Sequence, residues 1–231
     1  MRLQDRLDAI SKRPSPRITP YMKGVMARAI EDLRQSGVNE RVIKLGAIAP
    51  DFILRDGADQ SVALTALRER GPVVISFYRG IWCPYCNEDL KALEEALPLI
   101  KKAGANLVAI SPQKPTNSRK AARELGLTFP LLWDDGGAVA EAFGVRFNFP
   151  TDLRQVYAAL GVDLERINGN AAWSLPMPGR FVVERNGVIS FAESDPDYRV
   201  RPNPDHVVSH LTRAAAESAS VRKKGWPPAC R

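Results

Sequence analysis

The chain has 231 residues, of which 45% are hydrophobic and 26% are charged, and its formal net charge at pH 7 is +7. This length suits one domain with extensions. No apolar run reaches a length of about 18 residues, which argues against a membrane span. The basic excess is scattered or terminal, as at Arg222, Lys223 and Lys224, so no nucleic-acid partner is expected.

The start of the chain lacks the features of an export signal. Asp5 and Asp8 fall where a secretory signal needs an unbroken apolar stretch, so the sequence predicts a cytoplasmic protein. Three cysteines are too few for a disulfide-built scaffold, and Cys83 and Cys86 form a close Cys-x-x-Cys pair. Such a pair in a cytoplasmic chain indicates redox or metal chemistry.

The first part of the chain predicts an arm and then a strand. Apolar residues recur at helical spacing within residues 1–44, between prolines, which predicts a helical N-terminal arm. The arm is expected to pack either on the domain or on a second subunit, and the second arrangement would make the protein a homodimer. Residues 51–54 and 62–64 flank an Asp-Gly turn signal and predict a hairpin. The β-branched and aromatic run 72–78 is typical of a buried central strand, and it leads directly to the cysteines.

A helix is predicted to begin at the cysteine pair. Leucines recur at helical spacing from Pro84 to the stop signal Gly104, with Pro98 as a candidate kink. Alternating elements then predict an α/β sheet with parallel crossover connections. These elements are strand 106–111, helix 117–125, strand 129–133 and helix 138–143.

The last part of the domain makes the predicted sheet mixed. Residues 145–176 are expected to be a longer, less regular insertion. Asn186-Gly187, between strands 181–184 and 188–191, is a strong signal for an antiparallel hairpin. A closing helix is predicted to start near Pro204. The expected organisation is an arm at 1–44, a domain at 45–218 and a basic flexible tail at 219–231.

The placement of the cysteine pair favours a reactive thiolate. A cysteine in the first turn of a helix meets unpaired N–H groups and the positive end of the helix dipole. A second cysteine one turn on can attack a sulfenic acid or mixed disulfide formed on the first. Because the first sulfur of such a pair is the more exposed, Cys83 is predicted to attack and Cys86 to resolve. This hypothesis would fail if the sulfurs lay deep in apolar packing, faced apart or bound a metal ion.

The cysteine pair has two alternative interpretations, a zinc site and two inert core cysteines. His206 and His210 could complete a zinc site, but about 120 residues separate them from the cysteines and they suit an exposed helix face, so no metal is predicted. Two inert core cysteines are the other alternative, which a buried strand ending at a helix N-terminus disfavours.

Four segments carry a family resemblance: Ala49–Phe52, Phe77–Cys86, Val108–Pro112 and Pro176–Val183. They resemble the alkyl hydroperoxide reductase/thiol-specific antioxidant family, the peroxiredoxins, in its branch with a Cys-Pro-Tyr-Cys centre. The resemblance implies a thioredoxin-like three-layer α/β fold with a mixed central sheet. It also implies a thiol peroxidase that reduces hydrogen peroxide or organic hydroperoxides through a sulfenic acid and disulfide cycle, with a thioredoxin- or glutaredoxin-like reductant and no bound cofactor.

The sequence departs from the family motif at the site itself. The family places a proline seven positions and a threonine three positions before its peroxidatic cysteine. Counting along the motif puts that cysteine at Cys86, with Arg79 at the proline position and Cys83 at the threonine position. The familiar arginine position before Phe181 holds Pro178. The attacking sulfur therefore stays open between the two cysteines.

Further residues are candidates for the site. Arg79 and Arg180 are predicted to stabilise a thiolate or bind a peroxide oxygen, the alternative being a surface cation. Trp82 is a candidate to shield the sulfurs or to dock a substrate, although an aromatic beside a central strand is more often core. Pro84 and Tyr85, between the cysteines, complete the predicted substrate-binding set with Trp82.

The resemblance also suggests a role for a proline after the insertion. Pro178 is predicted to be the cis-proline that faces the cysteines in thioredoxin-like proteins, with Pro176 as the fallback. Cys230 is predicted to be a free exposed thiol. Two other functions stay open: a general protein thiol-disulfide oxidoreductase without peroxide selectivity, and a non-catalytic interaction module on a thioredoxin-like core.

Overall fold

A mixed seven-stranded sheet forms the centre of the protein. The computed structural model describes residues 2–223, with side chains described as far as residue 217. In this part of the chain the strand order of the sheet is β2-β1-β5-β4-β3-β8-β9. β3, β4 and β5 run parallel, whereas β1, β2, β8 and β9 pair antiparallel with their neighbours, so the predicted mixed sheet is confirmed. The strands are β1 Ile53–Asp56, β2 Ser61–Ala63, β3 Val73–Phe77, β4 Asn106–Ser111, β5 Leu131–Trp133, β8 Gly179–Val183 and β9 Ile189–Ser194.

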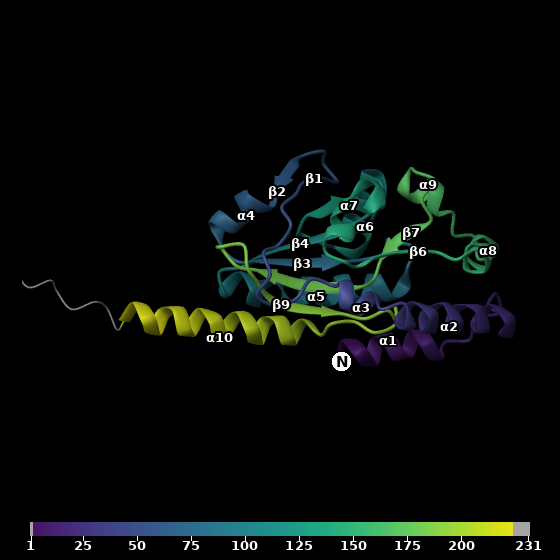
Figure 1. Cartoon of the computed structure of the whole chain (residues 1–231), viewed down its shortest axis with the longest axis horizontal. Coiled ribbons are helices and arrows are strands. Elements are labelled where there is room, and N and C mark those ends of the chain that lie inside the picture. The colour runs from purple at the N-terminus through teal and green to yellow at the C-terminus, as the bar shows by residue number, and fades with distance from the viewer. Residues whose placement is uncertain (1, 224–231) are drawn as a thin grey trace, which may run out of the picture.

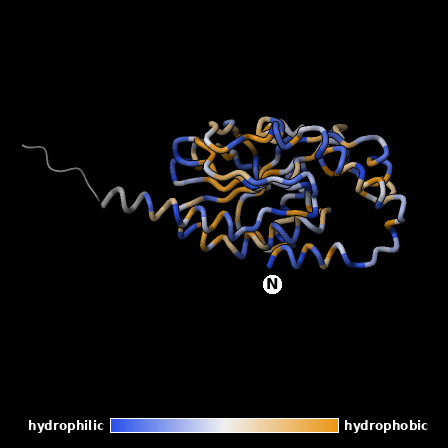
Figure 2. The backbone as a smooth tube through the Cα atoms, turned by 60° about the horizontal axis from the view of Figure 1, so that its bottom comes forward, coloured by the Kyte–Doolittle hydropathy of each residue, from blue (hydrophilic) through white to orange (hydrophobic). Residues whose placement is uncertain are grey.

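The central strand β3 is buried on both faces of the sheet. Its side chains alternate between two hydrophobic clusters: Ile75 and Phe77 belong to one, and Val74 belongs to the other, together with Tyr78 just after the strand. This alternation follows from the period of two in an extended chain, and burial on both faces explains the continuous apolar run in the sequence. Figure 2 shows hydrophobic colouring along the central strands.

Helices cover both faces of the sheet, which gives the expected three layers (Figure 1). The first cluster contains apolar residues of α4 and α7, and the second contains those of α5, α6 and α10. A short 3-10 helix, Asp135–Gly137, precedes α7. The bounds are α4 Leu64–Arg70, α5 Pro84–Lys102, α6 Pro115–Leu125, α7 Ala138–Ala142 and α10 Pro204–Lys223.

The N-terminal arm is helical, as predicted, and packs on the domain of its own chain. It consists of α1 Leu3–Lys12, α2 Pro20–Gln35 and α3 Val38–Arg41. α1 lies along α5, where Leu3 and Leu7 contact Ala92. α2 packs on the insertion that follows β5. The arm therefore closes over the same helix that carries the cysteines.

The insertion at 145–176 is more regular than predicted. It contains β6 Arg146–Asn148, α8 Thr151–Ala159, α9 Leu164–Asn168 and β7 Ser174–Pro176, with β6 and β7 paired antiparallel. The sequence did not predict these elements because they are too short to show a clear period. They are stabilised by a cluster of their own in which Phe149, Leu153 and Tyr157 pack against Val25 of the arm.

The closing helix α10 extends further than predicted. It reaches Lys223, so residues 219–223 of the predicted flexible tail are helical. The rest of that tail, with Cys230, lies outside the described residues. Among residues 2–223, no helix combines the length and the apolar character that crossing a bilayer requires.

Candidate active site

The site begins where β3 ends and α5 starts. The connecting loop contains Gly80, whose φ of 139° lies in the region that favours glycine. A Cβ at this position would lie 2.6 Å from Nε1 of Trp82, so the close turn requires glycine. Cys83 is the N-cap of α5, Pro84 occupies the first helical turn, and Cys86 follows within that turn. The predicted helix start at the cysteine pair is confirmed.

The two sulfurs are deeper than the sequence predicted. Cys83 is 2% exposed and Cys86 is fully buried, and both are free cysteines. Cys83 is the slightly more exposed of the two, as predicted, but both are covered because Ile81, Trp82 and Tyr85 pack against the cluster that contains them. Exposure therefore does not distinguish the attacking sulfur from the resolving one.

Polar groups approach the sulfurs within this apolar cluster. The Arg79 backbone N–H donates to Cys86 Sγ at 3.4 Å, and Nη2 of Arg201 donates to the same sulfur at 3.3 Å. The side chains of Cys83 and Cys86 also interact with each other, which lowers the pKa of Cys83 and raises that of Cys86. Both sulfurs thus lie deep in an apolar cluster, but two polar donors reach Cys86 Sγ there, so the packing does not isolate that sulfur from polar groups.

The electrostatics place the negative charge of the resting pair on Cys83. Burial alone would raise the pKa of the Cys83 thiol, but the hydrogen bond from Cys86 and the positive charges of Arg79 and Arg201 lower it to about 5. Burial and the neighbouring Cys83 thiolate raise the pKa of Cys86 well above its ordinary value. At neutral pH the pair therefore holds one thiolate, on Cys83, and one thiol, on Cys86.

Arg79 is a buried cation, not a surface one. Its side chain is 2% exposed, and Nη2 donates to the Tyr157 hydroxyl at 2.5 Å. The guanidinium carbon lies 4.9, 5.4 and 4.5 Å from the ring centroids of Trp82, Tyr157 and Tyr198. Ring faces at these distances stabilise a desolvated cation. Its positive charge contributes to the low pKa of Cys83.

Arg180 lies beside the cysteine helix, as expected, but its hydrogen bonds go elsewhere. Its guanidinium is fully buried and donates to Asp89 Oδ1 at 2.7 Å and to the Pro202 carbonyl at 2.5 Å. Asp89 belongs to α5, so the pair links β8 to that helix. Arg180 thus acts on the site through Asp89. The residue that reaches sulfur from this side is Arg201, which the sequence analysis did not single out.

The residues predicted to contact substrate have different surroundings. Trp82 is half-buried and meets Tyr157 edge to face, with ring centroids 5.7 Å apart. The Tyr85 hydroxyl lies 3.0 Å from the hydroxyl of Ser11 in α1, which fastens the arm to the cysteine turn. Pro84 is exposed on the first turn of α5. None of these positions excludes contact with a small substrate.

Pro178 is buried, but the prediction of a cis bond there was wrong. The described peptide bonds include no cis bond. The chain passes extended from β7 into β8, and the backbone N–H groups of Met177 and Asp195 hold this passage by donating to the carbonyls of Val145 and Pro178. Pro178 and Arg79 both line a cavity of about 20 Å³, which has room for roughly one water molecule.

The two histidines of α10 contact β9. His206 Nδ1 lies 3.2 Å from a carboxylate oxygen of Glu193, and His210 Nε2 lies 2.9 Å from the hydroxyl of Ser190. Both partners belong to β9, so the pair faces that strand. Among the described residues, no group of three His, Cys, Asp or Glu side chains is placed to hold a metal ion.

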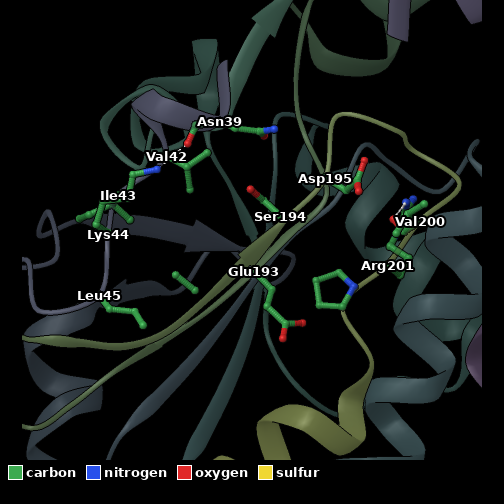
Figure 3. A pocket seen from close by; sticks show the side chains of 12 residues that line it. Asn39, Val42, Ile43, Lys44, Leu45, Glu193, Ser194, Asp195, Val200 and Arg201 are labelled. Atoms are coloured by element: carbon green, nitrogen blue, oxygen red, sulfur yellow. Dashed lines mark hydrogen bonds between the residues drawn. The ribbon is translucent and has the colours of Figure 1, made fainter. Parts of the chain in front are cut away.

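A larger pocket lies on the other side of Arg201 (Figure 3). It has a volume of about 490 Å³ and is lined by residues 39 and 42–45, by 192–195 at the end of β9, and by Val200, Arg201 and Pro202. Neither cysteine lines it. The side chain of Arg201 is fully buried and reaches inward to Cys86, so this residue separates the pocket from the sulfurs.

A mixed sheet between two helical layers, with a Cys-x-x-Cys at the start of the helix after the central strand, defines a thioredoxin-like protein. The chain belongs to the AhpC/TSA family, whose model matches residues 45–192. It is 32% identical over 162 residues to alkyl hydroperoxide reductase E of Mycobacterium tuberculosis, covering 69% of this chain and 91% of that protein. It is also 35% identical over 104 residues to the thiol-disulfide oxidoreductase ResA of Geobacillus thermodenitrificans, covering 45% and 59%.

Solved structures show the same fold. The crystal structure of peroxidoxin BcpB from Mycobacterium tuberculosis aligns with a TM-score of 0.59 at 23% identity, covering 74% of this chain and 97% of that one. A structure of peroxiredoxin Q from Xanthomonas campestris aligns with a TM-score of 0.57 at 21% identity, covering 75% and 98%. The predicted thioredoxin-like fold and the family resemblance are confirmed.

Proposed function

We propose that the chain is an antioxidant thiol peroxidase that reduces hydrogen peroxide or organic hydroperoxides with the Cys83/Cys86 pair. The Cys83 thiolate attacks the O–O bond and becomes a sulfenic acid, and Cys86 then closes a disulfide. A thioredoxin- or glutaredoxin-like dithiol reduces that disulfide, and no bound cofactor is needed. The reducing cytoplasm is the setting that keeps such a pair available.

One observation carries this proposal: a low-pKa thiolate is held in a site almost closed to solvent. Cys83 is 2% exposed, yet the pKa of its thiol is about 5. A buried thiolate is costly unless charges and hydrogen bonds stabilise it, and Arg79 and Cys86 supply these. A site this closed admits a small oxidant more readily than the disulfide of a folded protein, which favours a peroxide as substrate.

The neighbouring residues have distinct proposed roles. Arg79 stabilises the thiolate and offers N–H groups to a peroxide oxygen, and its Nε has no hydrogen-bond partner among the described atoms. Trp82 shields the sulfurs from bulk water. Pro84, Tyr85 and Pro178 are proposed to shape the entry of the substrate, and the AhpC/TSA membership supports a peroxide in this place.

The test is rapid mixing of the reduced protein with hydrogen peroxide or cumene hydroperoxide. We expect a Cys83–Cys86 disulfide to form far faster than peroxide oxidises a free thiol. Single Cys83→Ser and Cys86→Ser variants, trapped with a sulfenic-acid reagent and read by mass spectrometry, identify the attacking sulfur. The Cys230→Ser variant is the matched control and should react like the wild type. Oxidation at the rate of a small thiol would contradict the proposal.

A second candidate is a protein thiol-disulfide oxidoreductase. The N-cap cysteine with the lower pKa stands first in the motif, which is the thioredoxin arrangement, and the similarity to ResA supports the same chemistry. Reduction of insulin disulfides by the dithiol form, in the absence of peroxide, would favour this function. Partner binding that survives a double cysteine-to-serine substitution would instead favour a non-catalytic interaction module.

A further inference from the structure

Arg201 is a buried cation directed at Cys86, the sulfur that resolves in the proposed cycle. Its side chain is fully buried, and Nη2 lies 3.3 Å from Cys86 Sγ. The same sulfur accepts a second hydrogen bond, from the Arg79 backbone N–H. In the proposed cycle the N-cap residue Cys83 attacks first and Cys86 resolves. Two donors, one of them charged, thus converge on the sulfur that closes the disulfide.

A network of charges fixes Arg201 in this position. Its Nε lies 3.7 Å from Asp89 Oδ2, and its Nη1 donates to the carbonyls of Tyr198 and Val200. Asp89 is fixed in turn by Arg180, which donates to Oδ1 at 2.7 Å. Both carboxylate oxygens of one buried aspartate therefore face buried guanidiniums. A buried cation held so firmly keeps its direction while the charge of the sulfur changes.

We infer that Arg201 serves the second step of the cycle, in which Cys86 must become the thiolate that closes the disulfide. This inference rests on the proposed peroxidase function. Arg79 and Arg201 both favour the charge on Cys83 during peroxide attack, but of the two it is Arg201 whose side chain is hydrogen bonded to Cys86 and receives the charge there during resolution. Arg201 acts on a reacting atom, and Asp89 is a positioning residue that acts through it.

The chemistry balances with the groups present. The Cys83 thiolate attacks the terminal peroxide oxygen, the O–O bond breaks, and Cys83 becomes a sulfenic acid while an alkoxide leaves. The Cys86 thiol gives its proton to that alkoxide, so the alcohol forms and the negative charge moves to Cys86. The Cys86 thiolate then attacks the Cys83 sulfur, the S–S bond forms, and hydroxide leaves to become water with a proton from solvent.

The test compares the two steps in an Arg201→Gln variant. In the wild type and the variant, peroxide-dependent formation of the sulfenic acid and closure of the disulfide are timed separately by quenched mass spectrometry. At pH 7 we expect little change in the first step, because a Cys83 thiol with a pKa of about 5 stays mostly ionised after losing one charge partner. Closure should slow by about 10- to 100-fold, the loss of a hydrogen bond to a charged group, and the Cys83 sulfenic acid should accumulate.

Two further variants make the comparison specific. Arg201→Lys keeps a cation beside Cys86 and should restore much of the closure rate. Arg123→Gln removes an exposed arginine from α6 and should leave both steps unchanged. A slowed first step with unchanged closure would overturn the inference and place peroxide attack on Cys86, and equal slowing of both steps would overturn it as well.

One measurement needs no variant. If the alkoxide takes the proton of Cys86, the rate of disulfide closure in the wild type should vary little with pH around neutrality. A closure rate that rises about tenfold per pH unit would mean that solvent deprotonates Cys86, and it would overturn the proton transfer to the alkoxide. A wild type that forms no disulfide with peroxide would contradict the proposed function itself. A wild type that cycles, with a normal closure rate in Arg201→Gln, would contradict only the role of Arg201.

Discussion

Replacing Cys86 by alanine should raise the pKa of Cys83, because the variant loses the hydrogen bond that the Cys86 thiol gives to the thiolate. The difference between the ordinary value of 9.0 and about 5 corresponds to about 5 kcal/mol of preference for the thiolate. One hydrogen bond to a charged group contributes about 1.5 to 3 kcal/mol. The pKa of Cys83 should therefore rise to about 6 to 7 in the alanine variant, while the charges of Arg79 and Arg201 keep it below the ordinary value.

The assay is the ultraviolet absorbance of the thiolate, followed across pH in a Cys230→Ser background so that Cys83 is the sole cysteine. Cys86→Ser is the matched control, since its hydroxyl still donates a hydrogen bond and should leave the pKa of Cys83 close to about 5. Alanine and serine variants that titrate together would refute the role of this hydrogen bond. An alanine variant that titrates near the ordinary pKa would refute the contribution of the two arginines.

Three further predictions concern stability, measured by urea unfolding of the reduced protein. Because folding lowers the pKa of Cys83, the stability that this residue contributes is lost as pH falls towards about 5. The free energy of unfolding of the wild type should therefore exceed that of a Cys83→Ser variant by a margin that grows by about 1.4 kcal/mol per pH unit up to the ordinary thiol pKa. A margin that does not change with pH would contradict this. Arg180→Leu leaves Asp89 with a weaker counter-charge and should cost about 3 to 5 kcal/mol. Leu7→Ala should lower the free energy of unfolding by about 2 to 5 kcal/mol, because Leu7 is buried in the contact between the arm and α5. Arg6→Ala, which removes an ion pair on the surface, should lower it by less than about 1 kcal/mol. Equal losses in the two variants would contradict the packing of the arm.

The elements around the cysteines could be predicted because their signals are local. β3 is a continuous apolar run, and α5 combines an N-cap position, a proline in its first turn and regular leucines, so each segment specifies its own conformation. The hairpin of β8 and β9 is similar, since Asn186-Gly187 specifies a tight turn. These signals predicted a mixed sheet and placed the sulfurs at a helix start.

The polar surroundings of the sulfurs depend on contacts between distant parts of the chain. Arg201 reaches Cys86 across 115 positions, from a segment between β9 and α10 that has no periodicity. Nothing in the sequence distinguishes this arginine from a solvated one, because its burial depends on Asp89 and on the carbonyls around it. The same reason explains why Arg180 was expected near the helix but not as the partner of Asp89.

The depth of the cysteines was missed for another reason. A helix start predicts accessible N–H groups, but whether a side chain there meets water depends on what else covers it. In this chain the arm lies along α5, and the hydroxyls of Ser11 and Tyr85 lie 3.0 Å apart over its first turn. The residues that decide the exposure of Cys83 and Cys86 are thus far away in sequence.

The closed position of the sulfurs has a consequence for the regeneration of the enzyme. Reduction of a disulfide requires the incoming sulfur to approach along the S–S axis, and no protein thiol can do so while Cys83 and Cys86 are 2% and 0% exposed. In the proposed cycle, an oxidised pair buried to the same extent would have to become exposed before a reductase could act. At saturating reductase the rate of recovery would then be set by this opening and not by the concentration of the partner.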